Sequence, residues 1–369
     1  MTSRSGYFRP DYFLLGSVWL LVFFGLAMLS SASSVISYEK WGDSFYMVKH
    51  QIYSGLIPGA ILFFIGLKIP YAFWRKAALP ILVGAVVLLV LVLIPGIGTR
   101  LGGARSWFVL SGFSFQPSEF AKVALIFYLA AWIGRHKDTI ASFKEGFMPF
   151  WMIVGMIGVL LLGQPDFGTT MIVGATAMAM YILAGASWKH IGSIFGLAAL
   201  AVIPLVKIAP HRAARLMTFV HPEFDPQGVG YHINQALLAV GSGGLFGLGF
   251  GQSRQKFRYL PEVSGDSIFA IISEELGFFI ATLFLVFLCW IFLRLIRLAQ
   301  DSPDDFARFT ILGAVSWFGI QSVVNLAAML GLLPITGLPL PFISYGGTSL
   351  AAGLFLIGVI GNISQHVKK

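Results

Sequence analysis

Long apolar stretches alternate with short polar connections along most of the chain. A window of about 19 residues, the length that crosses a bilayer as a helix, separates ten such stretches. They lie near residues 12–32, 52–68, 78–95, 117–134, 148–163, 168–186, 190–207, 268–293, 309–332 and 346–364. The pattern predicts an all-α polytopic membrane protein of about ten transmembrane helices, organised as a single transmembrane domain over residues 1–369.

Lysine and arginine are distributed unequally between the two sets of predicted loops. If the N-terminus is inside, the short external loops hold only Lys40, Lys49, Arg100 and Arg105. The cytoplasmic segments hold fourteen basic residues: Arg4, Arg9, Lys68, Arg75, Lys76, Arg135, Lys137, Lys144, Lys189, Arg294, Arg297, Arg308, Lys368 and Lys369. Basic residues in short loops are retained on the cytoplasmic side of a membrane. Both termini are therefore expected in the cytoplasm.

One connection is much longer than the others. Residues 208–267, between the seventh and eighth predicted helices, mix polar and apolar positions, and loops of this length are usually functional. We expect a large extracytoplasmic loop there. Its charged residues are cationic overall, which suits a phosphate-bearing ligand: Arg212, Arg215, Arg254, Lys256 and Arg258 against Glu223, Asp225, Glu262 and Asp266.

The composition agrees with a membrane protein. Hydrophobic residues make up 57% of the 369 residues and charged residues only 11%, and the mean hydropathy is +0.82. The net charge of +9 has no separate basic tail or arm, so anionic lipid is a better partner class than nucleic acid. The single cysteine, Cys289, excludes an intramolecular disulfide. The first apolar stretch has no convincing cleavage site, so we expect no cleavable signal peptide.

Ionisable residues at the membrane are costly unless paired, and each is a candidate for function. Glu119 and Lys122 lie three residues apart at the outer end of the fourth predicted helix, so they share a face and can pair. A structural ion pair and a role in substrate binding are both open. Neighbouring Glu274 and Glu275 in the eighth helix point about 100° apart. At most one of these two is expected to face a given partner.

Two aspartates stand at predicted helix starts. Asp166 lies at the junction of the fifth and sixth helices, where helix capping is the simple alternative to a functional role. Asp266 ends the cationic loop and opens the eighth helix at the water–membrane boundary. A carboxylate there can meet a polar headgroup while it stays solvated enough to ionise. Capping is again the alternative.

The glycine-rich run at residues 241–251 fits no nucleotide-binding pattern. Its backbone N–H groups suggest an anion-binding nest, and a re-entrant loop packed between helices is the competing interpretation. The three loop histidines, His211, His221 and His232, have spacings that match no short zinc signature, so we predict no structural zinc site.

Several segments together resemble the SEDS family (shape, elongation, division and sporulation) of polytopic peptidoglycan polymerases, which FtsW and RodA represent. The resemblance covers nearly the whole chain. It rests on Gly103–Trp107 (GARSW), Phe115–Lys122 (FQPSEFAK), Gln164–Thr169 (QPDFGT), Gly241–Gly247 (GSGGLFG), Tyr259–Glu262 (YLPE), Glu274–Gly277 (EELG) and Pro339–Gly347 (PLPFISYGG). The segment from Gln252 to Glu262 looks more like the division-type FtsW pattern than the elongation-type RodA pattern. The family's His-Thr-Asp-Phe around its catalytic aspartate reads Ser-Gly-Asp-Ser here, at residues 264–267.

The resemblance implies a peptidoglycan glycosyltransferase that polymerises lipid II with inversion, during septal cell-wall synthesis in cell division. Asp266 then matches the catalytic aspartate and acts as general base. The residues implied in substrate binding are Arg105, Glu119, Lys122, Asp166, Arg212, Arg215, Lys256 and Ser344. No tightly bound cofactor is implied, and a divalent cation, Mg²⁺ or Mn²⁺, is a candidate bridge between phosphate oxygens.

The implied partners are a class B penicillin-binding protein transpeptidase and other membrane proteins of the division complex. The implied location is the bacterial inner membrane at the division septum. A RodA-type elongation polymerase, a lipid II flippase or other transporter, and a division scaffold without chemistry of its own remain alternative readings of the sequence.

Overall fold

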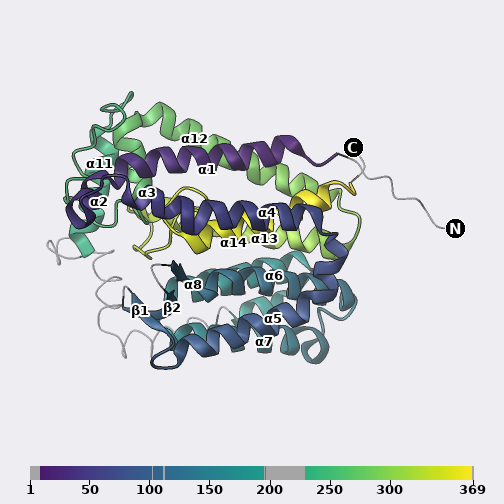
Figure 1. The fold of residues 1–369 in the computed structure, drawn as a ribbon. Helices are drawn as coiled ribbons and strands as arrows, with labels where there is room; N and C mark the ends of the chain where they lie inside the picture. The colour runs from purple at the N-terminus through teal and green to yellow at the C-terminus, as the bar shows by residue number, and fades with distance from the viewer. Residues whose placement is uncertain (1–8, 102, 111–112, 195, 197–228, 368–369) are drawn as a thin grey trace.

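The computed structural model describes residues 9–101, 103–110, 113–194, 196 and 229–367. Its helices run nearly side by side in one bundle (Figure 1). In the described part of the chain, seven helical spans are long and apolar enough to cross a membrane: Tyr12–Ala32, Tyr46–Lys68, Tyr71–Leu93, Phe143–Gly163, Ile268–Gln300, Asp305–Met329 and Gly347–Ser364. These spans confirm the polytopic membrane architecture expected from the sequence.

The first part of the chain forms six α-helices up to residue 135. They are α1 (Tyr12–Ala32), α2 (Ser34–Trp41), α3 (Tyr46–Gln51), α4 (Ile57–Lys68), α5 (Tyr71–Leu93) and α6 (Pro117–Arg135). A five-residue π-helical segment, Ile52–Leu56, joins α3 to α4. After α6, a second π-helical segment, Phe143–Phe147, leads into α7 (Met148–Gly163). Helix α8 (Phe167–Leu183) follows. The second half holds α11 (Val229–Ser242), α12 (Ile268–Gln300), α13 (Asp305–Met329) and α14 (Gly347–Ser364).

The count of ten spans is not reproduced within the described residues. The fourth predicted span is α6, a helix with a charged first turn that lies almost wholly inside the protein. The sixth is α8, which is apolar but only 17 residues long. Most of the seventh, near 190–207, lies outside the described residues. The eighth span is longer than predicted, because α12 continues to Gln300.

The loops contain two pieces of regular structure that the sequence did not predict. The fold is predominantly helical as predicted, but it is not strictly all-α, because the connection between α5 and α6 forms a three-stranded antiparallel sheet of β1 (Thr99–Leu101), β2 (Ala104–Leu110) and β3 (Phe113–Phe115). Gly103, with φ of +86°, lies in the turn between β1 and β2, where a left-handed backbone favours glycine. The described part of the long loop 208–267 is not irregular throughout, since it contains α11.

Helices α4 and α14 approach each other closely through glycines. A Cβ atom at Gly55 or Gly66 would overlap the backbone of α14, and one at Gly347 or Gly358 would overlap the segment from Ser54 to Phe63. Small residues allow such close backbone contact between helices in a membrane, where hydrophobic burial contributes little to association. Helix α14 is buried along nearly its whole length, whereas α4 buries only the face that contains Gly59, Phe63 and Gly66.

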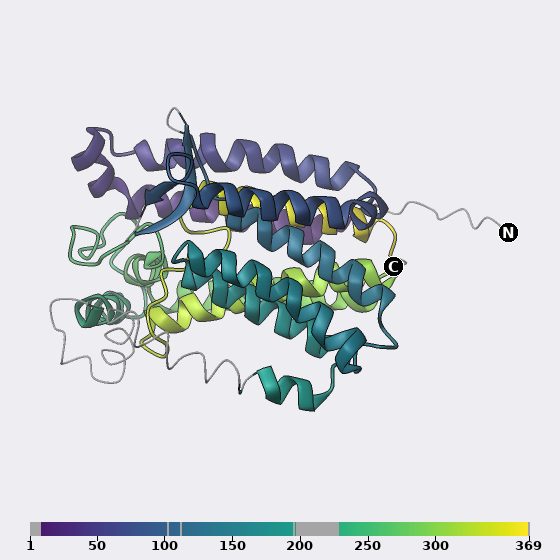
Figure 2. The ribbon, with the colours of Figure 1, turned by 90° about the horizontal axis from the view of Figure 1, so that it is seen from below.

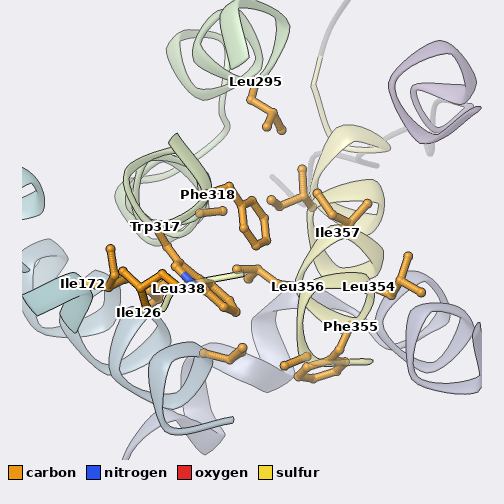
Figure 3. Close-up of a cluster of buried hydrophobic side chains, with 14 of the residues drawn as sticks. Ile126, Ile172, Leu295, Trp317, Phe318, Leu338, Leu354, Phe355, Leu356 and Ile357 are labelled. Atoms are coloured by element: carbon orange, nitrogen blue, oxygen red, sulfur yellow. The ribbon is translucent and has the colours of Figure 1, made fainter. Parts of the chain in front are cut away.

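The apolar core continues from α14 to α13 and α6. Trp317 and Phe318 of α13 lie between Ile126 of α6 and Leu356 of α14 (Figure 3). All four side chains are buried. The Trp317 ring also forms one wall of the polar cluster described below, so the core fixes the position of that cluster.

The two ends of the bundle differ. The described chain begins and finishes at one end, whereas α2, α11 and the β-strands gather at the opposite end (Figures 1 and 2). This arrangement agrees with both termini lying on the same side. The described part of the long segment before α12, which includes α11, lies at the end opposite the described chain ends.

Candidate active site

Asp266 lies immediately before α12, and its residue is only 6% exposed. The N-cap position of α12 is occupied by Ser267, one residue further on, so Asp266 does not cap this helix in the way that the sequence suggested. The expectation that this carboxylate is solvated is also wrong, because the surrounding segments cover Asp266. A buried carboxylate at a helix start that is not its cap is a stronger candidate for chemistry than a surface one.

The backbone around Asp266 is held from two sides. Asn325 of α13 donates from Nδ2 to the carbonyl oxygen of Asp266 at 2.8 Å and to that of Leu338 at 2.7 Å. The N–H of Tyr345 donates to the carbonyl oxygen of Ser264 at 2.8 Å. The segment before α12 and the segment before α14 are thus joined through α13. Sequence reasoning missed Asn325, because an amide inside an apolar helix has no motif.

A histidine from α11 reaches the same place. His232 Nε2 lies 2.7 Å from Ser267 Oγ, which donates to the carbonyl oxygen of Pro261 at 2.8 Å and lies 3.4 Å from Asp266 Oδ1. A hydroxyl has one proton. When that proton is given to Pro261, Ser267 Oγ accepts a hydrogen bond from the imidazole N–H. The sequence analysis treated His232 only as a possible metal ligand and did not place it beside Asp266.

Glu119 and Lys122 form the predicted ion pair. Lys122 Nζ donates to Glu119 Oε1 at 2.9 Å, and both side chains are buried. Lys122 Nζ also lies 3.5 Å from Gln321 Oε1 and 4.5 Å from the centre of the Trp317 ring. Glu119 Oε2 is buried with no hydrogen-bond partner in the structure. An acceptor left open beside a buried cation can receive a hydroxyl or amide of a ligand.

One face of α13 connects this pair to Asp266. Gln321 and Asn325 are four residues apart, so they are neighbours on the helix surface. Gln321 contacts Lys122 and donates from Nε2 to the carbonyl oxygen of Pro339 at 2.7 Å, while Asn325 holds the Asp266 backbone. The two charged groups that the sequence singled out separately are therefore parts of one polar region.

Asp166 performs the capping role that the sequence left open. Its Oδ1 accepts from the N–H of Thr169 at 3.0 Å as the N-cap of α8, and its Oδ2 lies 3.4 Å from Gln116 Nε2. Burial raises the pKa of the Asp166 carboxyl, while the hydrogen bonds from Thr169 and the charge of Lys122 oppose that rise. Asp166 therefore belongs to the same charged group as Lys122 and Glu119.

Lys256 is buried against protein acceptors. Its ammonium donates to the carbonyl oxygen of Gly251 at 2.6 Å, to Ser31 Oγ at 3.2 Å and to Glu275 Oε1 at 3.3 Å. An ammonium has three protons. All three have acceptors within the chain, so contact with substrate would require Lys256 to leave Glu275.

The expectation that at most one of Glu274 and Glu275 faces a given partner is wrong. Glu274 accepts from Ser253 Oγ at 2.5 Å and from the Arg254 N–H at 3.0 Å. Glu275 accepts from the N–H groups of Gly251 and Ser253 at 3.0 and 3.2 Å. The segment 251–255 wraps across the helix and meets both carboxylates, so two side chains about 100° apart bind one loop.

The glycine-rich run does not form an anion nest. Leu248 and Gly249 donate their N–H groups to the carbonyl oxygens of Glu274 and Glu275 at 3.0 and 2.9 Å. A Cβ atom at Gly247 would overlap the backbone of α12. The run is packed against α12, as the competing interpretation had it, and these N–H groups are used within the protein.

This packing depends on a break in α12. Gly277 has a non-helical backbone with φ of +75°, which favours glycine. After it, the N–H groups of Phe278 and Phe279 donate to the carbonyl oxygens of Gly244 and Leu245 at 2.9 and 3.2 Å. The loop thereby replaces helical hydrogen bonds that the break would leave open.

The remaining predicted site residues are placed as follows. Arg105 lies on β2 and donates to the carbonyl oxygen of Leu93 at 3.3 Å. Ser344 is buried, and its Oγ accepts from the Leu340 N–H at 2.8 Å, which stabilises the segment before α14. Arg212 and Arg215 lie outside the described residues, as do His211 and His221.

A tyrosine completes this end of the bundle. Tyr345 places its hydroxyl 2.7 Å from His50 Nδ1. Burial, followed by the nearby Tyr46, raises the pKa of Tyr345 to about 12, so the phenol stays protonated at neutral pH. The segment before α14 is thereby tied to α3 as well as to Asp266's own segment.

A divalent cation held by this region would need several oxygen ligands placed together. Within the described residues, no group of three or more His, Cys, Asp or Glu side chains is placed to hold a metal ion. Glu274 and Glu275 accept from N–H groups of the chain, and one oxygen of Glu119 accepts from Lys122. These described side chains do not by themselves supply the ligand set of a protein-held divalent cation.

The chain matches known proteins over nearly its whole length. The sequence model of the FtsW, RodA and SpoVE group, described as cell cycle protein, matches residues 12–369. Stage V sporulation protein E of Bacillus subtilis is 42% identical over 358 residues, with 97% of each chain covered. A probable peptidoglycan glycosyltransferase FtsW of Trichlorobacter lovleyi is 41% identical, with 97% of this chain and 94% of that protein covered.

Solved structures agree. A chain from a study of the structural coordination of polymerization and crosslinking by a peptidoglycan synthase complex matches with a TM-score of 0.80 and 29% identity, covering 96% of this chain and 97% of that one. The rod shape determining protein RodA of Thermus thermophilus matches with a TM-score of 0.69 and 27% identity, covering 97% of this chain and 96% of that one.

Proposed function

This chain belongs to the FtsW, RodA and SpoVE family of cell cycle proteins, and on that premise we propose that it is a peptidoglycan glycosyltransferase that polymerises lipid II. The observation that supports this most directly is the identity of about 40% over the full chain with proteins named as FtsW glycosyltransferases. Their name also supports the division-type assignment over the elongation type, and with it a role in septal synthesis.

The proposed reaction is a direct displacement. The 4-hydroxyl of the acceptor GlcNAc attacks C1 of the donor MurNAc, and undecaprenyl pyrophosphate leaves with the electrons of the broken C1–O bond. A sugar hydroxyl is a very weak acid, so a positioned base must take its proton. We assign that role to Asp266. Its support is geometric: the carboxylate is buried at a helix start without capping that helix, on a backbone fixed by Asn325.

The leaving pyrophosphate needs positive charge beside it. Arg105, Arg212 and Arg215 are the proposed sources. Lys122 is proposed to bind substrate together with the open oxygen of Glu119, which offers an acceptor to a ligand hydroxyl or amide. Lys256 is proposed to act on the loop alone, since its ammonium is fully used by protein acceptors.

The proposed setting is the bacterial inner membrane, with both termini in the cytoplasm and the Asp266 end facing outward. A class B penicillin-binding protein is the proposed partner, because a polymerase needs crosslinking activity from another chain. The structurally similar complex that coordinates polymerization and crosslinking supports that pairing.

The test of the reaction is Asp266→Asn in the purified protein. Asparagine keeps the shape and removes the proton acceptor, so polymerisation of lipid II should fall by roughly 10²–10⁴-fold while lipid II binding persists. Asp43→Asn, at an exposed aspartate paired with Lys49, is the matched control and should leave turnover unchanged. Near-normal polymerisation by Asp266→Asn would overturn the assignment.

The orientation is tested by cysteine labelling in a Cys289→Ser background. A cysteine at Ser242 should react with an impermeant reagent from outside, and one at Ser3 should not. Labelling of a cysteine at position 3 and protection of one at position 242 would reverse the proposed topology.

The proposed partner is tested by co-purification. The cognate transpeptidase should co-purify with this chain in mild detergent, and its absence would count against the pairing.

A further inference from the structure

A second polar cavity lies at the end of the bundle that carries the termini. Its volume is about 440 Å³, and it opens between the start of α5, the end of α6 and the start of α13. Asp266 comes just before α12, which starts at the opposite end of the bundle (Figure 1). The cavity is therefore separate from the candidate active site. Its lining is largely charged: Arg75, Lys76, Arg135, Asp304 and Asp305, with Ala131, Gly134 and Phe306.

Both acids in this lining already have partners. Asp304 caps α13 by accepting from the Ala307 N–H at 2.8 Å, and it pairs with Arg75 at 3.3 Å. Asp305 pairs at 3.3 Å with Lys137, which comes from the loop after α6. Each carboxylate is therefore balanced by one cation.

Among the described residues, two cations of the cavity have no counter-charge. Within the part of the chain that the structure describes, neither Lys76 nor Arg135 has an acidic group within ion-pair distance. They come from different helices, α5 and α6, and face one hollow. This pair of cations suits a singly or doubly charged phosphate, and the guanidinium of Arg135 matches phosphate oxygens in geometry.

The surface beside the cavity is apolar. Phe73, Leu79 and Val83 of α5 are 52%, 57% and 53% exposed, on a helix whose apolar span is mostly unburied within the protein. Such a face lies against lipid tails. A ligand that places a phosphate in the cavity and apolar chains along α5 is an amphiphile, which separates this site from one for a free metabolite.

We propose that this cavity binds the headgroup of an anionic phospholipid of the cytoplasmic leaflet, with Lys76 and Arg135 on the phosphate. Basic pockets between transmembrane helices on the cytoplasmic side bind such headgroups. The proposal uses the orientation proposed above only to name the leaflet, and it does not depend on the polymerase reaction or on Asp266.

The experiment is native mass spectrometry of the full chain in detergent, with phosphatidylglycerol, cardiolipin or phosphatidylcholine of equal acyl chains. The wild type should retain the two anionic lipids and lose phosphatidylcholine. The double variant Lys76→Gln with Arg135→Gln should weaken retention by on the order of 30-fold, since each cation near an anionic headgroup contributes roughly a fivefold factor. Circular dichroism and thermal melting verify that the variant is folded.

The matched control is Lys144→Gln with Lys189→Gln, which removes the same charge from exposed positions predicted on the same side but outside the cavity. It should retain anionic lipid within about threefold of the wild type. Equal loss in both double variants would reduce the effect to general surface charge and overturn the site. Displacement of the lipid by millimolar glycerol 3-phosphate, or by an acidic peptide of a partner, would also overturn it.

Discussion

Lys256 and Glu275 offer the sharpest test of how the loop before Asp266 is held. Lys256→Met removes the ammonium and leaves a carboxylate whose side chain is 0% exposed. Breaking a buried pair on one side costs about 3–5 kcal/mol. Glu275 keeps three other donors, from Ser31, Gly251 and Ser253. We therefore expect a loss at the lower end of this range, about 3 kcal/mol in the free energy of unfolding.

The second arm of this test neutralises the partner. Glu275→Gln in the Lys256→Met background removes the uncompensated charge, so the double variant should be less destabilised than the sum of the two single variants. A coupling of at least about 1 kcal/mol is expected for groups in contact. The assay is reversible unfolding in mixed detergent, followed by circular dichroism. Polymerisation should recover in parallel with stability, since the loop leads directly to Asp266.

Lys49→Met is the control, because it breaks an exposed pair with Asp43 at 2.7 Å, and the free energy of unfolding should not change measurably. The reasoning is refuted if Lys256→Met is as stable as the wild type. It is also refuted if the two single effects simply add, since additivity would mean that Lys256 and Glu275 do not interact.

Three further predictions concern single positions. Lys122→Met should lower polymerisation by more than its loss of stability explains, whereas a purely structural pair with Glu119 predicts equal losses; melting and turnover on one sample separate these outcomes. Gly247→Ala should destabilise the protein by more than about 1 kcal/mol, because the φ of Gly247 is +79° and the added methyl overlaps a carbonyl of α12. An unchanged melting curve would contradict the described packing. His232→Ala should lower kcat about 2- to 10-fold through loss of one hydrogen bond to Ser267, with KM and lipid II binding unchanged; a rise in KM alone would contradict a positioning role.

The sequence by itself located most of the apolar helices, although not their number. A stretch of about 20 apolar residues has few alternatives to a membrane helix, because lipid offers no hydrogen bonds to an open backbone. The predicted spans 12–32 and 148–163 coincide with α1 and α7. Local spacing was equally informative for the pair of Glu119 and Lys122, three residues apart on one helix, and for the cap at Asp166.

Short elements outside the apolar stretches were not predictable in this way. The three strands between α5 and α6 are three to seven residues long, and their pairing is decided by contacts between strands rather than by any pattern within one. The break at Gly277 interrupts an apolar helix without changing its hydropathy. Only the packing of the glycine-rich run reveals why the helix opens there.

The candidate site shows the same division. Asp266 was recognisable from its place in the sequence, but its surroundings were not, because Asn325 lies 59 residues away and His232 comes from another helix. Side chains so distant along the chain meet only when α11, α12 and α13 pack together. Sequence patterns report the neighbours on one helix face or in one turn. The environment that shields Asp266 from water and orients it is set by contacts between elements, which the tertiary structure alone decides.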